Sequence, residues 1–207
     1  MYEAVMRLIR KYVSSVPVDV KGIAERSGIA LIPLTQICAG TGMGPGEVYA
    51  IWGNQDGVAN AHKGRYAVAY NDTVPEVRRR FTVAEELMHI FLGHLSPEFN
   101  VYEQSYSDTL YRQCEKVAKV CAGMLLCPPK LYYTHEAYIT APTLAKLCEV
   151  SVECAERAMS IYASPGVRRE LCGSVEYGFM PVPAVPDWGG RLLWSDREKS
   201  DTIKYYY

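Results

Sequence analysis

The pattern of apolar and polar positions divides the chain into helical segments and one short stretch of strands. In most of the chain, apolar residues recur every three or four positions, which is the period of a helix with one buried face. This spacing predicts helices over residues 2–14, 19–27, 80–94, 108–126, 131–138, 142–148 and 152–162. Asp19 is a suitable N-cap for the second of these helices, and Gly28 is a suitable stop.

Four short segments favour strands instead, namely residues 29–34, 48–52, 57–60 and 65–70. Asn, Asp and Gly residues separate the last three, as in tight turns between antiparallel strands. We therefore predict an α+β fold that is mainly helical, with a small, mostly antiparallel sheet of three or four strands preceding the helix at 80–94. The glycine-rich passage 39–46 is expected to be a mobile loop rather than a phosphate site, because no Lys-Ser/Thr pair follows it.

The composition changes after residue 162. Residues 1–162 are predicted to form one domain, whereas residues 163–207 mix prolines, glycines and aromatic side chains. We expect this second part to be an extended appendage that packs on the domain. Its function is open between a further packing layer or dimer contact and a lid that regulates access to a cleft.

Charge and hydropathy exclude several classes of protein. The 207 residues carry 22 basic and 23 acidic side chains, which gives no bulk attraction to nucleic acid or to an anionic membrane. Charged residues interrupt the N-terminal helix, and no apolar run approaches the roughly 18–20 residues that span a bilayer. We expect a cytoplasmic protein whose seven cysteines, with no Cys-x-x-Cys pair, are small buried side chains in a reducing compartment.

The helix at 80–94 carries the most distinctive chemistry. Glu85 and His89 lie four positions apart and therefore share one face of the helix, with Glu86 beside them. The order Glu-Glu-x-x-His differs by one residue from the His-Glu-x-x-His pattern, in which two imidazoles bind zinc and the Glu acts on water. Glu85 stands where that pattern has its first histidine.

A third candidate ligand lies on the helix at 108–126. An antiparallel helix pair would bring Glu115 opposite the face that carries Glu85 and His89. Each residue alone also has a plainer interpretation: Glu85 as a solvated charge, His89 as a hydrogen-bonded core histidine, and Glu115 as a carboxylate at the helix edge. His94 does not match the spacing of three-histidine zinc proteases and is expected to interact at the helix end. Candidates for an oxyanion-stabilising hydroxyl are Tyr70, Tyr102 and Tyr106.

Two spaced motifs resemble the ImmA/IrrE family of zincin-fold metallopeptidases. The family pattern Arg-Phe-Thr-x-Ala-His-Glu-x-x-His corresponds here to Arg80-Phe-Thr-Val-Ala-Glu-Glu-Leu-Met-His89. The pattern Glu-x-x-Ala-Asn-x-Phe-Ala-x-x-Leu-Leu-x-Pro corresponds to Glu115-Lys-Val-Ala-Lys-Val-Cys-Ala-Gly-Met-Leu-Leu-Cys-Pro128. A Val-Ser segment at 150–151 resembles a third family element, so the resemblance covers residues 19–161.

The resemblance implies a metal-dependent endopeptidase in which Glu86 is the general base that activates a metal-bound water. His89 and Glu115 would be metal ligands, and Glu85 occupies the position of the missing histidine ligand. Family members are encoded on mobile elements such as phages or in stress regulation, and they cleave a helix-turn-helix repressor to relieve transcriptional silencing. The implied partner is therefore such a repressor.

The extra carboxylate alters the expected metal chemistry. Two carboxylates and one imidazole cancel the charge of a divalent ion, which weakens its pull on water. An oxygen-richer site also shifts preference from zinc towards manganese or iron. The alternative to a peptidase is a metal-free pseudopeptidase that acts as a protein-binding regulator.

Residues 143–159 also suggest a helix-turn-helix, with Ser151 as the N-cap of its second helix. DNA recognition would require basic and amide side chains in the first turns of that helix. That second helix offers Glu153 and Glu156 with Arg157 alone as a cation, so phosphate repulsion disfavours direct DNA binding. We expect this pair of helices to pack against the rest of the domain.

Overall fold

The computed structural model describes residues 2–95 and 108–173. Contacts divide the chain into two compact units, Asp19–Ala122 and a second that joins Met1–Val18 to Gly123–Tyr207. The first unit contains the sheet and the candidate site. The second is helical throughout its described part.

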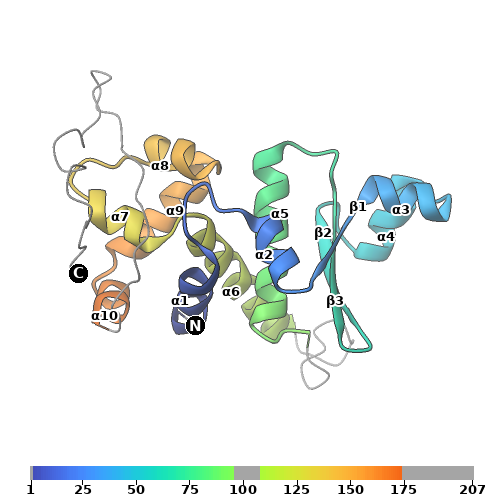
Figure 1. Cartoon of the computed structure of the whole chain (residues 1–207), viewed down its shortest axis with the longest axis horizontal. Helices are drawn as coiled ribbons and strands as arrows, with labels where there is room; N and C mark the ends of the chain where they lie inside the picture. The colour runs from blue at the N-terminus through green and yellow to red at the C-terminus, as the bar shows by residue number, and fades with distance from the viewer. Residues whose placement is uncertain (1, 96–107, 174–207) are drawn as a thin grey trace. The chain divides into compact units, whose positions relative to one another are not determined.

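The first unit contains a three-stranded sheet of order β1-β3-β2 (Figure 1). Strand β1 (Ala30–Pro33) runs parallel to β3 (Arg65–Tyr70), with Ala30 opposite Ala67. Strand β2 (Gly57–His62) runs antiparallel to β3 and is joined to it by a tight turn at Lys63 and Gly64, both at positive φ. The sheet is thus mixed rather than mostly antiparallel, because the chain between β1 and β2 crosses over before it pairs again.

That crossover is helical, so the predictions of a loop at 39–46 and a strand at 48–52 were wrong. Helices α3 (Leu34–Thr41) and α4 (Pro45–Trp52) occupy it. Pro45 is the first residue of α4, and the backbone N–H of Gly44 donates to the Glu47 carboxylate at 2.8 Å. Gly42 and Gly53 end the two helices at φ values of 75° and 73°. The glycines therefore mark helix ends instead of a mobile segment.

Helices α5 (Glu76–Phe91) and α2 (Val20–Arg26) pack against the sheet (Figure 1). Val83 and Leu87 lie in the buried stripe of α5, as the apolar spacing predicts. Gly57 permits close packing of β2, because a Cβ there would lie 2.7 Å from the Ala69 carbonyl oxygen and 2.8 Å from Thr82 Cγ2. The predicted cap of α2 is confirmed: the Asp19 carboxylate accepts from the Gly22 N–H at 2.9 Å.

Helix α6 (Asp108–Leu126) has the predicted bounds and carries Glu115 in the part that belongs to the first unit. In the second unit the helices are α1 (Tyr2–Tyr12), α7 (Pro129–His135), α8 (Ala141–Cys148), α9 (Val152–Ala163) and α10 (Pro165–Gly173). Buried Tyr162 connects two of its segments, because the hydroxyl donates to the Cys127 carbonyl at 2.5 Å. No described helix is long and apolar enough to cross a membrane.

The predicted helix-turn-helix corresponds to α8 and α9, and Ser151 caps α9 by accepting from the Cys154 N–H at 3.1 Å. Helix α10 occupies the start of the segment predicted as an extended appendage, so residues 165–173 are helical. The appendage beyond residue 173 lies outside the described residues. The division of the chain at residue 162 stays a prediction.

Candidate metal centre

Helix α5 positions the first two residues of the site. Its apolar stripe faces the sheet and α2, so the adjacent face presents Glu85 and His89 one turn apart. His89 is buried, with 2% of its side chain exposed, whereas Glu85 retains 15% exposure. The placement of Glu85 and His89 on one face follows from the helix period alone.

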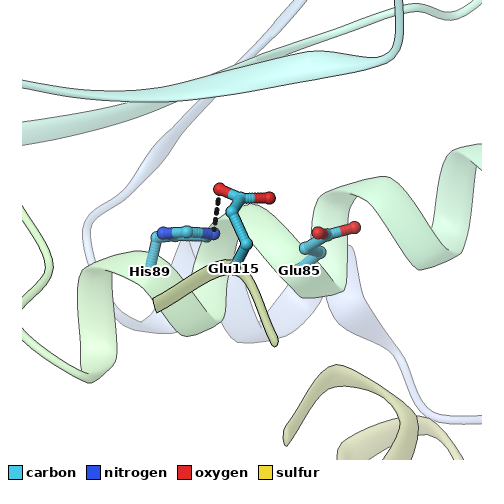
Figure 2. A group of neighbouring side chains, drawn as sticks. All are labelled: Glu85, His89 and Glu115. Carbon is cyan, nitrogen blue, oxygen red and sulfur yellow. Dashed lines mark ion pairs between the residues drawn. The ribbon is translucent and has the colours of Figure 1, made fainter. Parts of the chain in front are cut away.

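Helix α6 supplies the third residue. Figure 2 shows Glu115 reaching towards the imidazole of His89, with Glu85 one turn earlier on α5. His89 Nε2 and Glu115 Oε1 are 3.4 Å apart, and one ligand atom from each of the three side chains falls within 4.8 Å of the others. The structure therefore brings Glu85, His89 and Glu115 together, as the helix-pair argument predicts.

His94 holds the imidazole of His89 from the other side. Gly93, at φ 76°, turns the chain back so that the His94 N–H donates to the His89 carbonyl at 2.9 Å. The two Nδ1 atoms then lie 3.2 Å apart. Burial lowers the pKa of both histidines to about 4, so His89 is neutral at pH 7 and its contact with Glu115 is not an ion pair.

Glu85 is a partly buried carboxylate with one cation beside it. Burial raises the pKa of Glu85 to about 7, the Lys119 ammonium opposes that shift, and Glu115 adds to it. Lys119 Nζ lies 3.6 Å from Glu85 Oε1 and 3.6 Å from Glu115 Oε2. The ammonium thus bridges the two carboxylates.

Glu86 is oriented by the edge strand of the sheet. The backbone N–H of Ala59, in β2, donates to Glu86 Oε2 at 2.6 Å. Burial raises the pKa of Glu86 to about 8 despite this hydrogen bond, and Glu85 and Glu115 add to the effect. In the metal-free chain a carboxyl group with this pKa is mostly protonated at pH 7, and a dication bound nearby would lower the pKa towards the range of a general base.

The match to known families bears directly on this cluster. The model of the IrrE N-terminal-like domain, a peptidase family, matches residues 52–160. The chain belongs to this family. The matched range contains all four residues, Glu85, Glu86, His89 and Glu115, and no curated protein matches the chain.

Membership of the IrrE N-terminal-like family confirms the resemblance drawn from the two motifs and agrees with an α+β zincin-like fold. It indicates a metallopeptidase-like function and a divalent metal. Two ligand atoms at about 2.1 Å from a tetrahedral ion lie about 3.4 Å from each other. The separation of His89 Nε2 and Glu115 Oε1, long for a hydrogen bond, matches that value, and the Glu85 oxygen lies within 4.8 Å of both, so the three side chains are a donor set that a divalent cation could draw together.

Two further residues of α6 contact the cluster and were missed in the sequence. Lys119 lies one turn after Glu115, and Tyr111 lies one turn before it. The Tyr111 hydroxyl donates to the Glu115 carboxylate, and the pKa of Tyr111 is raised first by burial and then by that charge. Lys119 and Tyr111 each lie four positions from Glu115 and therefore share its face of the helix, and this spacing is the feature of the sequence that could have identified them.

Other candidate residues lie elsewhere. Tyr70, considered for an oxyanion role, has 7% exposure and ends strand β3. Tyr102 and Tyr106 fall outside the described residues. His62 is an exposed residue at the end of β2, and His135 is buried in the second unit.

Proposed function

We propose that this chain is a metal-dependent endopeptidase in which Glu86 takes the proton of the attacking water. The observation that carries the proposal is the hydrogen bond from Ala59 N–H to Glu86 Oε2, which holds this carboxylate beside the three-residue cluster. Family membership supports the reaction class. The residue roles are inferred from their positions.

Glu85, His89 and Glu115 would hold the divalent cation, and neutral His89 would offer Nε2 while its Nδ1–H donates to His94. When bound, such a cation polarises a substrate carbonyl and makes water more acidic. Two carboxylates in this set favour manganese or iron alongside zinc. In that tautomer, His94 would be the hydrogen-bond partner that orients the His89 ring from outside the ligand set.

Glu86 is suited to move one proton. With Oε2 held by Ala59, Oε1 is the oxygen that receives the proton from water and then donates it to the leaving amine. Its burial excludes water from one side and keeps its affinity for protons high. Both properties depend on the packing of α5 against β2.

For the substrate, we propose a helix-turn-helix repressor and a role in transcription regulation on a mobile element or in a stress regulon. The support is the family resemblance of the two motifs alone. A cytoplasmic location is part of the same proposal, since such repressors act there.

A pseudopeptidase that binds protein partners without cleaving them is the second candidate. The position of Lys119 favours it, because the ammonium already supplies positive charge to the two carboxylates that would hold the metal. In this alternative the fold recognises a partner through the same face, and Glu86 has no chemical role.

The test is Glu86→Gln, which keeps the shape and the acceptor for Ala59 but removes the proton acceptor. The wild-type chain, loaded with zinc or manganese, is incubated with a proteome-derived peptide library and with purified helix-turn-helix repressors, and new N-termini are identified by mass spectrometry. We expect cleavage by the wild type and at least about a 100-fold loss in the variant. Glu153→Gln, at a side chain 80% exposed on α9, is the matched control. Equal cleavage by the Glu86 variant would refute the assignment, and no cleavage by any of them would favour the pseudopeptidase.

A further inference from the structure

Lys119 occupies a distinctive position beside the candidate metal ligands. It lies one turn after Glu115 on α6, and its ammonium is 3.6 Å from an oxygen of each of two carboxylates, Glu85 Oε1 and Glu115 Oε2. The same two carboxylates supply two of the three donors that could hold a cation. The Lys119 ammonium and a bound metal ion would therefore both be stabilised by the negative charge of the same two carboxylates.

The contact is one that the lysine can leave. Both distances exceed those of a tight charge-assisted hydrogen bond, and the Lys119 side chain is 46% exposed. Lysine has a long flexible stem, and an exposed ion pair holds it weakly. The ammonium can therefore move into solvent without disturbing α6.

We propose that Lys119 is a built-in competitor of the metal, whose ammonium must leave Glu85 and Glu115 before a divalent cation binds the three ligands. A dication among these carboxylates would repel the neighbouring ammonium, while its removal forfeits two ion pairs. Lys119 thereby lowers the affinity of the site and makes loading depend on metal concentration. The inference rests on the proposed metal site but does not require peptidase activity.

The first test compares metal affinity among variants of the full chain. Zinc and manganese are titrated at pH 8 against wild type, Lys119→Met, Lys119→Arg and Lys116→Met, with calorimetry or a chromophoric chelator as the readout. Methionine keeps the apolar stem without the charge, arginine keeps the charge, and Lys116 is an exposed lysine of the same helix. We expect Lys119→Met to bind about tenfold more tightly, equivalent to about 1.4 kcal/mol, and the other two variants to match wild type.

The second test follows the lysine itself in the unmodified chain. Brief acylation with an amine-reactive ester, followed by mass spectrometry, compares Lys119 with Lys116 with and without saturating zinc. We expect zinc to raise the reactivity of Lys119 severalfold and to leave Lys116 unchanged, because the displaced amine becomes accessible.

The outcomes separate this inference from the proposed function. Equal affinities for wild type and Lys119→Met, no metal binding by either, or unchanged acylation of Lys119 would each overturn it. Tighter binding by Lys119→Met and increased acylation, in a chain that cleaves nothing, would support the competition while refuting the peptidase.

Discussion

Glu86 is predicted to destabilise the metal-free fold at neutral and alkaline pH, and Glu86→Gln is predicted to remove that effect. Burial raises the pKa of Glu86 from 4.5 to about 8. Because this pKa is higher in the folded state than in the unfolded chain, the folded state retains the proton between these two values. The free energy of unfolding therefore falls as pH rises through this interval.

The magnitude follows from the shift. Each unit of pKa corresponds to about 1.4 kcal/mol, so the wild type should lose about 4 kcal/mol relative to Glu86→Gln between pH 5 and pH 8. Below pH 4.5 the group is protonated in both states, and the two proteins should be similar. Glutamine is neutral throughout and still accepts from the Ala59 N–H, so the hydrogen bond is preserved. The contribution of Glu85, whose pKa is also raised, is present in both proteins and largely cancels.

Urea unfolding followed by circular dichroism at pH 5, 6, 7 and 8, with a chelator present, measures the difference directly. The difference in free energy of unfolding between Glu86→Gln and the wild type should increase steadily with pH, whereas the corresponding difference for Glu153→Gln, at an exposed position, should not change with pH. A gap that is independent of pH would show that Glu86 is solvated in the folded chain, and the reasoning from burial would fail. Greater stability combined with lost cleavage would be the trade-off expected of a buried general base.

Two further predictions concern packing and ligand orientation. Gly57→Ala should lower the free energy of unfolding by about 1–3 kcal/mol in the same urea assay, because its Cβ would lie 2.7 Å from the Ala69 carbonyl oxygen in β3. The control is Gly46→Ala, where a Cβ meets nothing within 4 Å. An unchanged unfolding midpoint for Gly57→Ala would contradict the close approach. His94→Phe should weaken zinc binding by about 10- to 100-fold with little change in helix content, because His89 loses the partner of its Nδ1. The control His62→Phe, at an exposed position, should bind zinc as the wild type does. Equal zinc affinities for the wild type and both variants would show that His94 has no role in the site.

The helices could be predicted well because their signals are local. The apolar period, the Asp19 cap and the proline pair after Cys127 each act within a few residues, and the corresponding helices α2 and α6 have nearly the expected bounds. The segment at 39–52 was predicted wrongly because the same glycines suit both a free loop and helix ends. Only the capping contact between Gly44 and Glu47 distinguishes them, and a Gly-Pro-Gly-Glu sequence already offers it.

The sheet and the site differ in how far they could be predicted. The parallel pairing of β1 with β3 depends on a crossover that no local pattern encodes, so an antiparallel order was the natural expectation. The gathering of Glu85, His89 and Glu115 could be predicted because helix spacing and a helix pair suffice. The role of Ala59 could not, because a backbone N–H carries no signal in the side-chain sequence.

The consequence of having Glu85 in place of the motif's first histidine depends on the neighbouring Lys119 ammonium. A second carboxylate in a partly buried cluster destabilises the fold unless a cation accompanies it, and the raised pKa of Glu85 expresses that cost. Without metal, the Lys119 ammonium meets this requirement; with metal, a dication meets it and the lysine is free to leave. The negative charge of Glu85 is expected to weaken the polarisation of water by the metal ion. The same charge also makes the cluster suited to binding a cation. Under the proposed competition, Glu85 is a ligand whose occupancy depends on metal concentration, and the metal titration of Lys119→Met distinguishes this role from the remnant of a lost site.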